Sequence, residues 1–140
     1  MIDPDIHYAV EPRLPVSDFK KLLISSGLGA SRPVADEERL STMLLNSSLL
    51  LTARTKEPDN RLVGIARGIS DASWCCYLSE LAVCSSMQSR GIGKGLLMEA
   101  KRILGPEIPL ILVSVPEATK FHENTGMAKI ADAFWFKRER

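Results

Sequence analysis

An anion-binding loop is indicated by one short segment of the sequence, Gln88-Ser89-Arg90-Gly91-Ile92-Gly93. The segment lies between an apolar run that ends at Val83 and an amphipathic pattern typical of a helix. The first N–H groups of a helix have no partner within the helix, and the helix dipole favours negative charge there. Glycines leave room for a ligand to approach the backbone closely. This segment therefore predicts a site for a ligand with linked phosphates.

Two common phosphate-binding motifs do not fit this segment. A nucleotide P-loop has the pattern G-x-x-x-x-G-K-[ST], but Gly93-Lys94 is followed by Gly95. In addition, Gln88 stands where the first glycine of that pattern belongs. The dinucleotide fingerprint G-x-G-x-x-G fails because the glycines stand at positions 91, 93 and 95.

The rest of the chain predicts the elements that would position this segment. Apolar residues alternate or run continuously in some stretches and recur at helical spacing in others. The predicted strands are Ile6–Val10, Leu49–Thr55, Arg61–Ser70, Trp74–Val83, Pro109–Val115 and Ile130–Lys137. The predicted helices are Val16–Ser26, a helix capped by Asp36, a helix from Gly91 to Gly105, and Pro116–Thr125. The order β-α-α-β-β-β-α-β-α-β predicts an α/β (α+β) fold, a mixed sheet flanked by helices.

Some of the predicted strands carry more specific expectations. Arg61–Ser70 and Trp74–Val83 are expected to form an antiparallel meander. Pro109–Val115 is nearly continuous in apolar residues, as expected for a strand covered on both faces. The last strand carries Phe134-Trp135-Phe136, of which alternate members are expected in the core. The remaining aromatic ring allows a contact with a second subunit, and hence a homodimer.

The composition is that of an ordinary globular protein and argues against several partners. Its 140 residues suit a single domain, 1–140, with 45% hydrophobic and 25% charged residues. A net charge of +1 gives no broad basic surface for nucleic acid. No apolar run approaches the roughly 20 residues that cross a membrane. The segment 1–5 lacks the basic and apolar parts of a signal peptide.

The cysteines predict a reducing compartment. Cys75, Cys76 and Cys84 are odd in number, and two of them are adjacent, which does not suit a disulfide framework. They also lack the spacing of metal ligands, so no metal site is expected. We expect three small core residues in a cytoplasmic protein.

A second motif gives the glycine segment its context. The segment matches Q/R-x-x-G-x-G/A, the acyl-CoA loop, at every fixed position. Leu81-Ala82-Val83 precedes it, and Phe121-His122-Glu123-Asn124-Thr125-Gly126-Met127 follows. With these motifs the chain resembles the GNAT superfamily of N-acetyltransferases, in motif detail over Glu80–Met127 and in element order over nearly its whole length. The resemblance implies a splayed mixed sheet with acetyl-CoA between the two diverging strands.

The resemblance also implies which residues bind the cofactor. In the family the backbone of the strand before the loop pairs with the pantetheine arm, and Leu81, Ala82 and Val83 match this strand. Gln88 holds the first position of the loop motif. The amides that match the family's pyrophosphate cradle are those of Ser89, Arg90, Gly91, Ile92, Gly93 and Lys94. The side chains of Arg90 and Lys94 either add charge attraction or are solvated surface charges.

Two residues are candidates for acid–base catalysis. The family's usual tyrosine, thought to protonate the departing CoA thiolate, is replaced by His122. An imidazole has a pKa of about 6.5, against about 10 for a phenol, so His122 is a candidate general acid. The replacement could equally mark a lost acid, and Val115 stands where many members have asparagine. Glu80 is the candidate general base, acting directly or through a water, or else a partly exposed strand carboxylate.

The implied activity is acetyl-CoA-dependent N-acetyl transfer to a primary amine of a small molecule or an exposed amino group. The amine would attack the thioester carbonyl directly, with the N–H of Val83 holding the oxyanion. Cys84 has no histidine nearby in sequence and is not expected to be a nucleophile.

The acceptor and two alternative functions stay open on the sequence alone. In this family the first two helices and the loop Gly27–Pro33 would line the acceptor pocket. These elements contain Arg32, Asp36, Glu37 and Glu38, and the acidic residues could attract a cationic amine there, although capping and solubility explain them as well. One alternative is a CoA-binding sensor or structural module without turnover. The other is an unrelated nucleotide-binding protein, which would bind ATP or NAD.

Overall fold

The computed structural model describes residues 4–140 of the chain. Residues 1–3, part of the segment considered above for a signal peptide, lie outside the described residues. The strands are β1 (Ile6–Val10), β2 (Leu49–Thr55), β3 (Leu62–Ser70), β4 (Cys76–Val83) and β5 (Leu110–Ile111). The α-helices are α1 (Val16–Ser26), α2 (Glu37–Leu45), α3 (Ile92–Leu104) and α4 (Thr119–Asn124). The short 3₁₀ helices are η1 (Leu28–Ser31), η2 (Ser85–Met87) and η3 (Pro116–Ala118).

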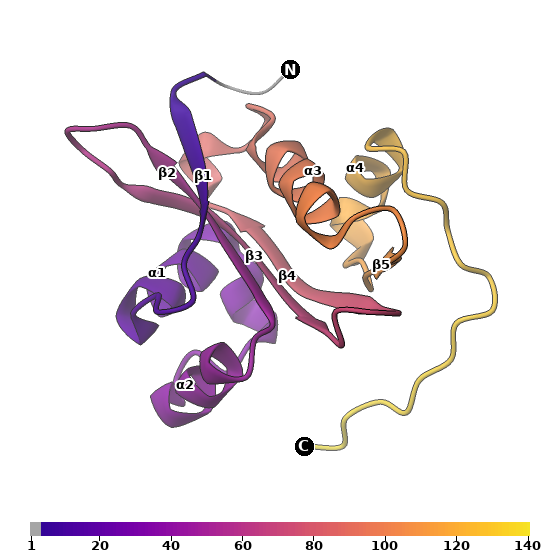
Figure 1. Cartoon of the computed structure of the whole chain (residues 1–140). Helices are drawn as coiled ribbons and strands as arrows, with labels where there is room; N and C mark the ends of the chain where they lie inside the picture. Colours follow the sequence, from indigo (N-terminus) through magenta and orange to yellow (C-terminus); the bar gives the residue numbers. More distant parts are fainter. Residues whose placement is uncertain (1–3) are drawn as a thin grey trace.

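One mixed sheet with the order β1-β2-β3-β4-β5 organises the described part of the chain. Its first four strands are antiparallel neighbours, which confirms the predicted meander. β5 runs parallel to β4 and pairs with it only at Cys76–Leu110 and Tyr77–Ile111. Beyond these two pairs β4 continues to Val83 without a described partner strand on this side, so the sheet opens there (Figure 1).

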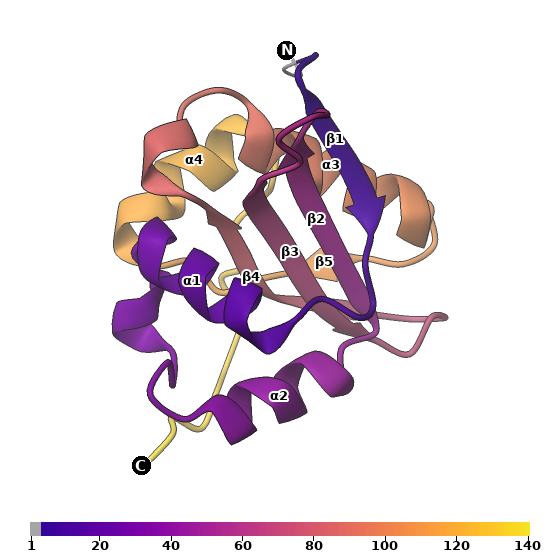
Figure 2. The same ribbon diagram turned by 90° about the vertical axis from the view of Figure 1, so that its left-hand side faces the viewer.

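Helices cover both faces of the sheet. α1 and α2 lie on one face, and α3 and α4 lie on the other (Figures 1 and 2). Each face buries its own apolar cluster, as a layered α/β fold requires. The cluster under α3 includes Leu49, Leu51, Val63, Ile92 and Leu96. The cluster under α1 and α2 includes Phe19, Leu23, Leu40, Leu50 and Ile65.

Local sequence signals set the helix boundaries. α1 ends at Gly27, whose φ of 93° is the left-handed conformation common after a helix. The side chain of Asp36 caps α2 by accepting a hydrogen bond from the N–H of Arg39 at 3.0 Å, as the sequence predicts. None of the helices formed by residues 4–140 is long and apolar enough to cross a membrane.

A β-bulge in β4 turns side chains to the opposite face of the sheet. Arg67 of β3 pairs with Glu80 and Gly68 pairs with Leu78, so Ser79 is the extra residue. A bulge of this kind bends the strand and re-aims the side chains that follow it. Leu78 therefore packs in the cluster under α3, whereas Glu80 points to the side of α1 and α2, where Arg32 and Arg67 meet it.

The predicted final strand is wrong. The segment Ile130–Lys137 forms no strand and runs along the outside of the molecule (Figure 1). The side chains of Phe134 and Trp135 are 93% and 68% exposed and that of Phe136 is fully exposed, so none of these rings lies in the core. Aromatic residues favour a strand only where an edge is available for pairing, and β5 offers only two residues.

The strand before α4 is also shorter than predicted. Of Pro109–Val115, only Leu110 and Ile111 are paired in the sheet. Val113 is mostly exposed, so this segment is not covered on both faces. The reason is that the sheet opens after Ile111, and the chain then follows the opening instead of the edge of β4.

The cysteines differ in their exposure. Cys76 is buried and Cys84 is half-buried, but Cys75 is exposed, so the expectation of three core residues is wrong for Cys75. The cause is a turn before β4. The carboxylate of Asp71 accepts hydrogen bonds from the N–H groups of Ser73, Trp74 and Cys75, which keeps Cys75 outside the strand.

Candidate active site

Three adjoining cavities cross the opening between β4 and the chain after β5. The loop cavity, of about 520 Å³, lies beside the glycine segment. The central cavity, of about 60 Å³, shares Leu28, Leu81, Val115 and Ala118 with the loop cavity. The basic cavity, of about 750 Å³, shares Arg32, Ser79, Val113, Ser114 and Val115 with the central cavity. A molecule that extends from the loop cavity through the central cavity would therefore meet one that occupies the basic cavity.

The loop cavity gathers most residues that the sequence suggests for the cofactor. Its lining includes Leu81, Ala82, Val83, Gln88, Ser89, Gly91, Ile92 and Gly93. Arg90 and Lys94 are exposed and do not line it. Ala118 and Phe121 close the cavity from the side of α4.

The open edge of β4 presents backbone groups to this cavity. The N–H of Cys84 donates to the carbonyl oxygen of Val63 in β3 at 2.9 Å. Because backbone groups alternate in direction along a strand, those of Val83 and Leu81 point away from β3, towards the opening. An extended ligand with amide groups could pair with this edge as a further strand would.

Gln88 ties the glycine segment to the end of β4. Its side-chain amide donates a hydrogen bond to the carbonyl oxygen of Val83 at 3.0 Å. Gln88 therefore positions the loop, and one of the two outward groups of Val83 is already occupied. The N–H of Val83 remains directed to the opening.

The first turn of α3 has backbone N–H groups without a partner inside the helix. Gly91 precedes the helix with a φ of 80°, a left-handed conformation that favours glycine. The N–H of Gly95 is hydrogen-bonded to the carbonyl oxygen of Gly91 at 2.9 Å, so the N–H groups of Ile92, Gly93 and Lys94 precede the intrahelical ladder. A Cβ on Gly93 would lie 3.0 Å from Cζ of Phe121, which shows how closely α4 approaches here.

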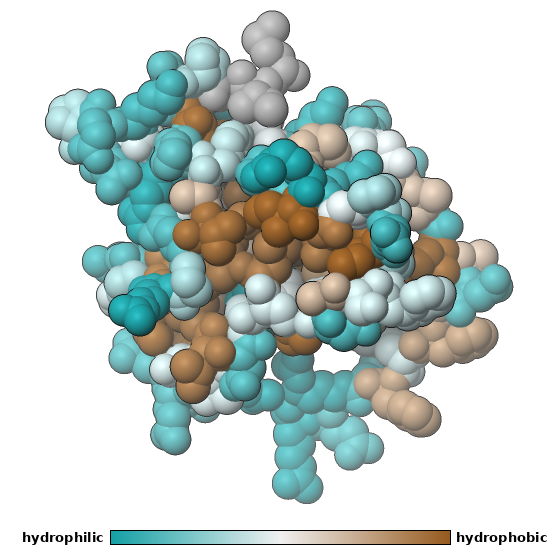
Figure 3. Space-filling view, in the orientation of Figure 1, coloured by the Kyte–Doolittle hydropathy of each residue, from teal (hydrophilic) through white to brown (hydrophobic). Residues whose placement is uncertain are grey.

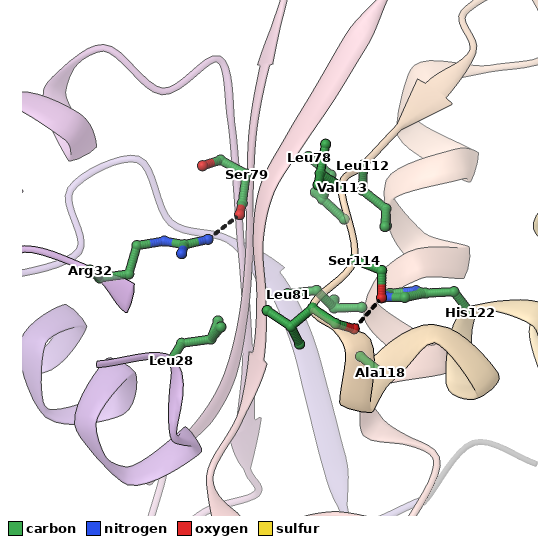
Figure 4. Close-up of a pocket in the computed structure, with 11 residues that line it drawn as sticks. Leu28, Arg32, Leu78, Ser79, Leu81, Leu112, Val113, Ser114, Ala118 and His122 are labelled. Atoms are coloured by element: carbon green, nitrogen blue, oxygen red, sulfur yellow. Dashed lines mark hydrogen bonds between the residues drawn. The ribbon is translucent and has the colours of Figure 1, made fainter. Parts of the chain in front are cut away.

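His122 lies at the central cavity. Figure 4 shows Arg32 on one side of β4, with His122 and Ser114 on the other. The Nδ1 atom of His122 is buried and has no hydrogen-bond partner among residues 4–140. Burial lowers the pKa of His122, so the neutral imidazole is its main form at neutral pH. The imidazolium that a general acid requires is therefore the minor form.

Glu80 lies at the wall of the basic cavity and is held by two arginines. Its side chain is buried, and one oxygen accepts a hydrogen bond from Nε of Arg67. The other oxygen accepts from Nε of Arg32 at 2.6 Å and from the hydroxyl of Ser79 at 2.8 Å. Burial acts to raise the pKa of Glu80, but the hydrogen bonds and charges of Arg67 and Arg32 outweigh it and hold the pKa below its usual value.

These contacts make Glu80 a poor proton acceptor, but they allow it to hold the side chains of Arg32 and Arg67 in place. Both of its oxygens are occupied, and a general base needs a pKa near the working pH. The guanidinium of Arg32 also donates to the backbone oxygen of Ser79 at 2.7 Å, and that of Arg67 donates to the backbone oxygen of Met43. The cluster therefore joins η1, α2, β3 and the bulge of β4. Sequence reasoning missed Arg67 and Ser79, because a bulge and its charge partners leave no periodic signal.

The charged side chains that line the basic cavity are mostly positive, whereas the sequence suggested acidic residues that would attract a cationic amine. Asp36 is used as a cap, and Glu37 pairs with Lys20 at 3.2 Å. Neither they nor Glu38 line the cavity. Its lining does include the expected loop and second helix, through Ser31, Arg32, Pro33, Arg39 and Met43.

A match to a family of domains decides what kind of protein this is. Residues 28–137 match the acetyltransferase (GNAT) domain family. The chain belongs to the GNAT acetyltransferase family. This GNAT chain is therefore an N-acetyltransferase, and its family uses acetyl-CoA and acetylates amine acceptors.

Relatives and solved structures agree with this assignment. The GNAT chain is 25% identical over 141 residues to ycf52 of Pyropia yezoensis, an uncharacterized N-acetyltransferase, with 96% of this chain and 79% of that protein covered. A GNAT-family acetyltransferase of Streptococcus pneumoniae TIGR4 has a TM-score of 0.71 at 20% identity, covering 96% and 99% of the two chains. An aminoglycoside acetyltransferase from an uncultured soil metagenomic sample, in complex with sisomicin, has a TM-score of 0.72 at 18% identity, covering 99% and 100%. The likeness to these structures confirms the predicted GNAT fold.

Proposed function

We propose that this GNAT chain transfers an acetyl group from acetyl-CoA directly to a primary amine of a small molecule or an exposed amino group. The observation that carries the proposal is the row of three adjoining cavities across the opening of the sheet. The amine nitrogen attacks the thioester carbonyl carbon, the carbon–sulfur bond breaks, and the sulfur leaves as the thiol of CoA. Placing both substrates in adjoining cavities supplies the proximity that such a transfer needs.

The loop cavity is the proposed site of acetyl-CoA. The free N–H groups of Ile92, Gly93 and Lys94 suit its pyrophosphate, and the exposed side chains of Arg90 and Lys94 add positive charge nearby. The backbone of Leu81, Ala82 and Val83 suits its pantetheine arm. The N–H of Val83 would then be available to the carbonyl oxygen as negative charge develops there.

His122 is the proposed proton donor to the departing sulfur. Its place at the central cavity and its unpartnered Nδ1 support this role. Because its pKa is lowered, the acid form becomes scarcer as the pH rises through that pKa. The acceptor amine has the opposite requirement, since it attacks only when neutral.

Glu80 is the candidate base of the sequence, but its contacts favour a positioning role. As an ionised carboxylate held by Arg32 and Arg67, it orients both guanidinium groups along the basic cavity. It would act on the acceptor through these arginines and not by taking up a proton.

Calorimetric titration with acetyl-CoA, with ATP and NAD as controls, tests the proposed donor. We expect acetyl-CoA alone to bind, and mixing the loaded protein with amines to release thiol. Binding of ATP or NAD but not of acetyl-CoA would contradict the proposed cofactor site. Acetyl-CoA binding without thiol release from any amine would instead favour a sensor or structural module.

We also propose an oligomeric state and a cellular compartment for this chain. The exposed aromatic residues of 134–136 favour burial against a second copy, and therefore a homodimer. The free cysteines, one of them exposed, favour the reducing cytoplasm.

A further inference from the structure

We propose that the acceptor of this enzyme carries an anionic group, a carboxylate or a phosphate, in addition to its amine. This inference rests on the proposed function, because it assigns the basic cavity to the acceptor. The cationic residues that line the cavity are Arg32, Arg39, Arg67, Lys137 and Arg138. Among the described residues that line it, Glu80 is the sole acidic one, which leaves an excess of four positive charges.

The arginines of the cavity differ in how far their charge is already used. Arg32 and Arg67 share the carboxylate of Glu80, so these three residues together carry one positive charge. The backbone N–H of Arg39 donates a hydrogen bond to the capping carboxylate of Asp36. The guanidinium of Arg39, in contrast, makes no hydrogen bond or ion pair with any residue between 4 and 140. Lys137 lies over the ring of Trp135, and Arg138 lies in the C-terminal segment outside any helix or strand, so Arg39, on α2, is the unpaired cation that the fold holds in place for a ligand.

Because most of the cations that line the cavity are arginine guanidinium groups, among them those of Arg32, Arg39 and Arg67, the cavity should favour carboxylate and phosphate groups. The parallel N–H donors of a guanidinium match the two oxygens of a carboxylate or the oxygens of a phosphate. A second ammonium group, as in a polyamine, would be repelled by the same lining. Trp135 and Tyr77 also line the cavity and offer ring surface to an apolar part of the acceptor.

The positive lining would also help the amine to react. Nearby positive charge disfavours the ammonium form and lowers the pKa of an amine. More of the acceptor would then be the neutral nucleophile, although Glu80 is not placed to remove its proton. Arg32, Ser79 and Ser114 line both the basic and the central cavities, so an acceptor anchored by its anion could direct its amine to the thioester.

Matched pairs of acceptors test this inference through thiol release at saturating acetyl-CoA. One set compares free L-amino acids with their carboxamides, and the other compares phosphoethanolamine with ethanolamine. We expect the best anionic member of one set to exceed its neutral counterpart in kcat/KM by roughly 10- to 100-fold, as for a charged hydrogen bond. The set that shows the preference distinguishes a carboxylate from a phosphate.

The variant Arg39→Gln tests the residue. We expect it to raise KM for the anionic acceptor by about tenfold or more, with little change in kcat or in KM for the neutral counterpart. Arg39→Lys should restore part of the loss, because it keeps the charge without the fork. Arg13→Gln is the matched control, since Arg13 is exposed and lines none of the three cavities.

Equal or better use of the neutral member in both sets, or better use of polyamines than of any anionic acceptor, would overturn the inference, as would an unchanged preference in Arg39→Gln. If acetyl-CoA binds but no amine releases thiol, the proposed function fails separately. Titration of the CoA-loaded protein with the same pairs then decides: tighter binding of the anionic members supports an anion site, and equal binding refutes it.

Discussion

A buried carboxylate between two arginines is the most constrained group of the described site. Glu80 is 1% exposed and Arg67 is 4% exposed, so neither charge can be solvated if its partner is removed. Removing one member of a buried ion pair leaves an uncompensated charge, which costs more than the pair itself contributes. Glu80 therefore governs the position of Arg67 and Arg32 and, through Ser79, of the bulge.

The variant Glu80→Gln should lower the free energy of unfolding by about 3–5 kcal/mol at neutral pH. The pKa of Glu80 is lowered by folding, so its contribution is complete above the unfolded-state pKa and is lost as the pH falls through the folded-state pKa. Urea unfolding at neutral and acid pH should therefore show a difference from wild type that shrinks on acidification. Glu99→Gln is the control, because its pair with Arg102 is exposed and should contribute less than about 1 kcal/mol. Equal effects of the two variants would refute the buried network.

The pH dependence of kcat tests whether His122 is the general acid. If its imidazolium donates the proton, His122→Gln should reduce kcat by roughly 10²–10⁴-fold and remove the decline of kcat as the pH rises through the pKa of His122. Affinity for acetyl-CoA should change little. The chain offers a matched control in His7→Gln, because His7 is exposed on β1. Unchanged kcat and an unchanged pH profile in His122→Gln would make His122 a structural residue.

Helix α3 is flanked by two glycines with positive φ that differ in ψ and in surroundings: ψ is 6° at Gly91, the left-handed conformation, and 176° at Gly105. Gly91 precedes it at a φ of 80° and Gly105 follows it at 82°. Both positions strain any residue with a side chain. Only Gly91 borders the loop cavity, where the free N–H groups of the first turn gather.

Comparison of Gly91→Asp with Gly105→Asp separates strain from ligand binding. Both variants should lower stability, measured by thermal unfolding, and Gly105→Asp should do so more, because positive φ with ψ near 180° is almost confined to glycine whereas aspartate tolerates the left-handed conformation of Gly91. Gly91→Asp alone should weaken acetyl-CoA binding by about two orders of magnitude, the equivalent of two lost hydrogen bonds to charged groups. Calorimetric titration measures this difference. Similar affinity in the two variants would place the pyrophosphate elsewhere.

For the molecule as a whole, the C-terminal segment is where three exposed aromatic side chains follow one another. Figure 3 shows apolar groups standing out at the lower right, where this segment runs in Figure 1. The three rings at 134–136 are mostly or fully exposed, although aromatic side chains usually gain most from burial. The same segment contributes Trp135, Lys137 and Arg138 to the basic cavity, so covering it would also shape that cavity.

The double variant Phe134→Ser/Phe136→Ser should shift the protein from dimer to monomer in sedimentation equilibrium. The physical reason is the loss of apolar area that a second copy would cover. Leu45→Ser is the control, because Leu45 is also exposed but lies on α2. A wild-type protein that stays monomeric at high concentration would contradict the proposed homodimer.

The features that depend on near neighbours along the chain could be predicted from the amino-acid sequence. Helix α2 follows the cap at Asp36, α1 stops at Gly27, and the glycine segment precedes α3, as predicted. The order of the elements from β1 to α4 followed as well. Caps, turns and periodicity act within a few residues, so they can be recognised without knowing the fold.

The features that join distant parts of the chain could not be predicted in this way, because they depend on the folded arrangement of the elements. Arg32 and Glu80 are 48 residues apart, and their contact also depends on the bulge at Ser79. The predicted strand Ile130–Lys137 failed because pairing requires a free edge, which local propensity cannot supply. The positive charge of the basic cavity arises in the same way, since its cations come from four separate parts of the chain that only the fold brings together: Arg32 after η1, Arg39 of α2, Arg67 of β3, and Lys137 and Arg138 of the C-terminal segment.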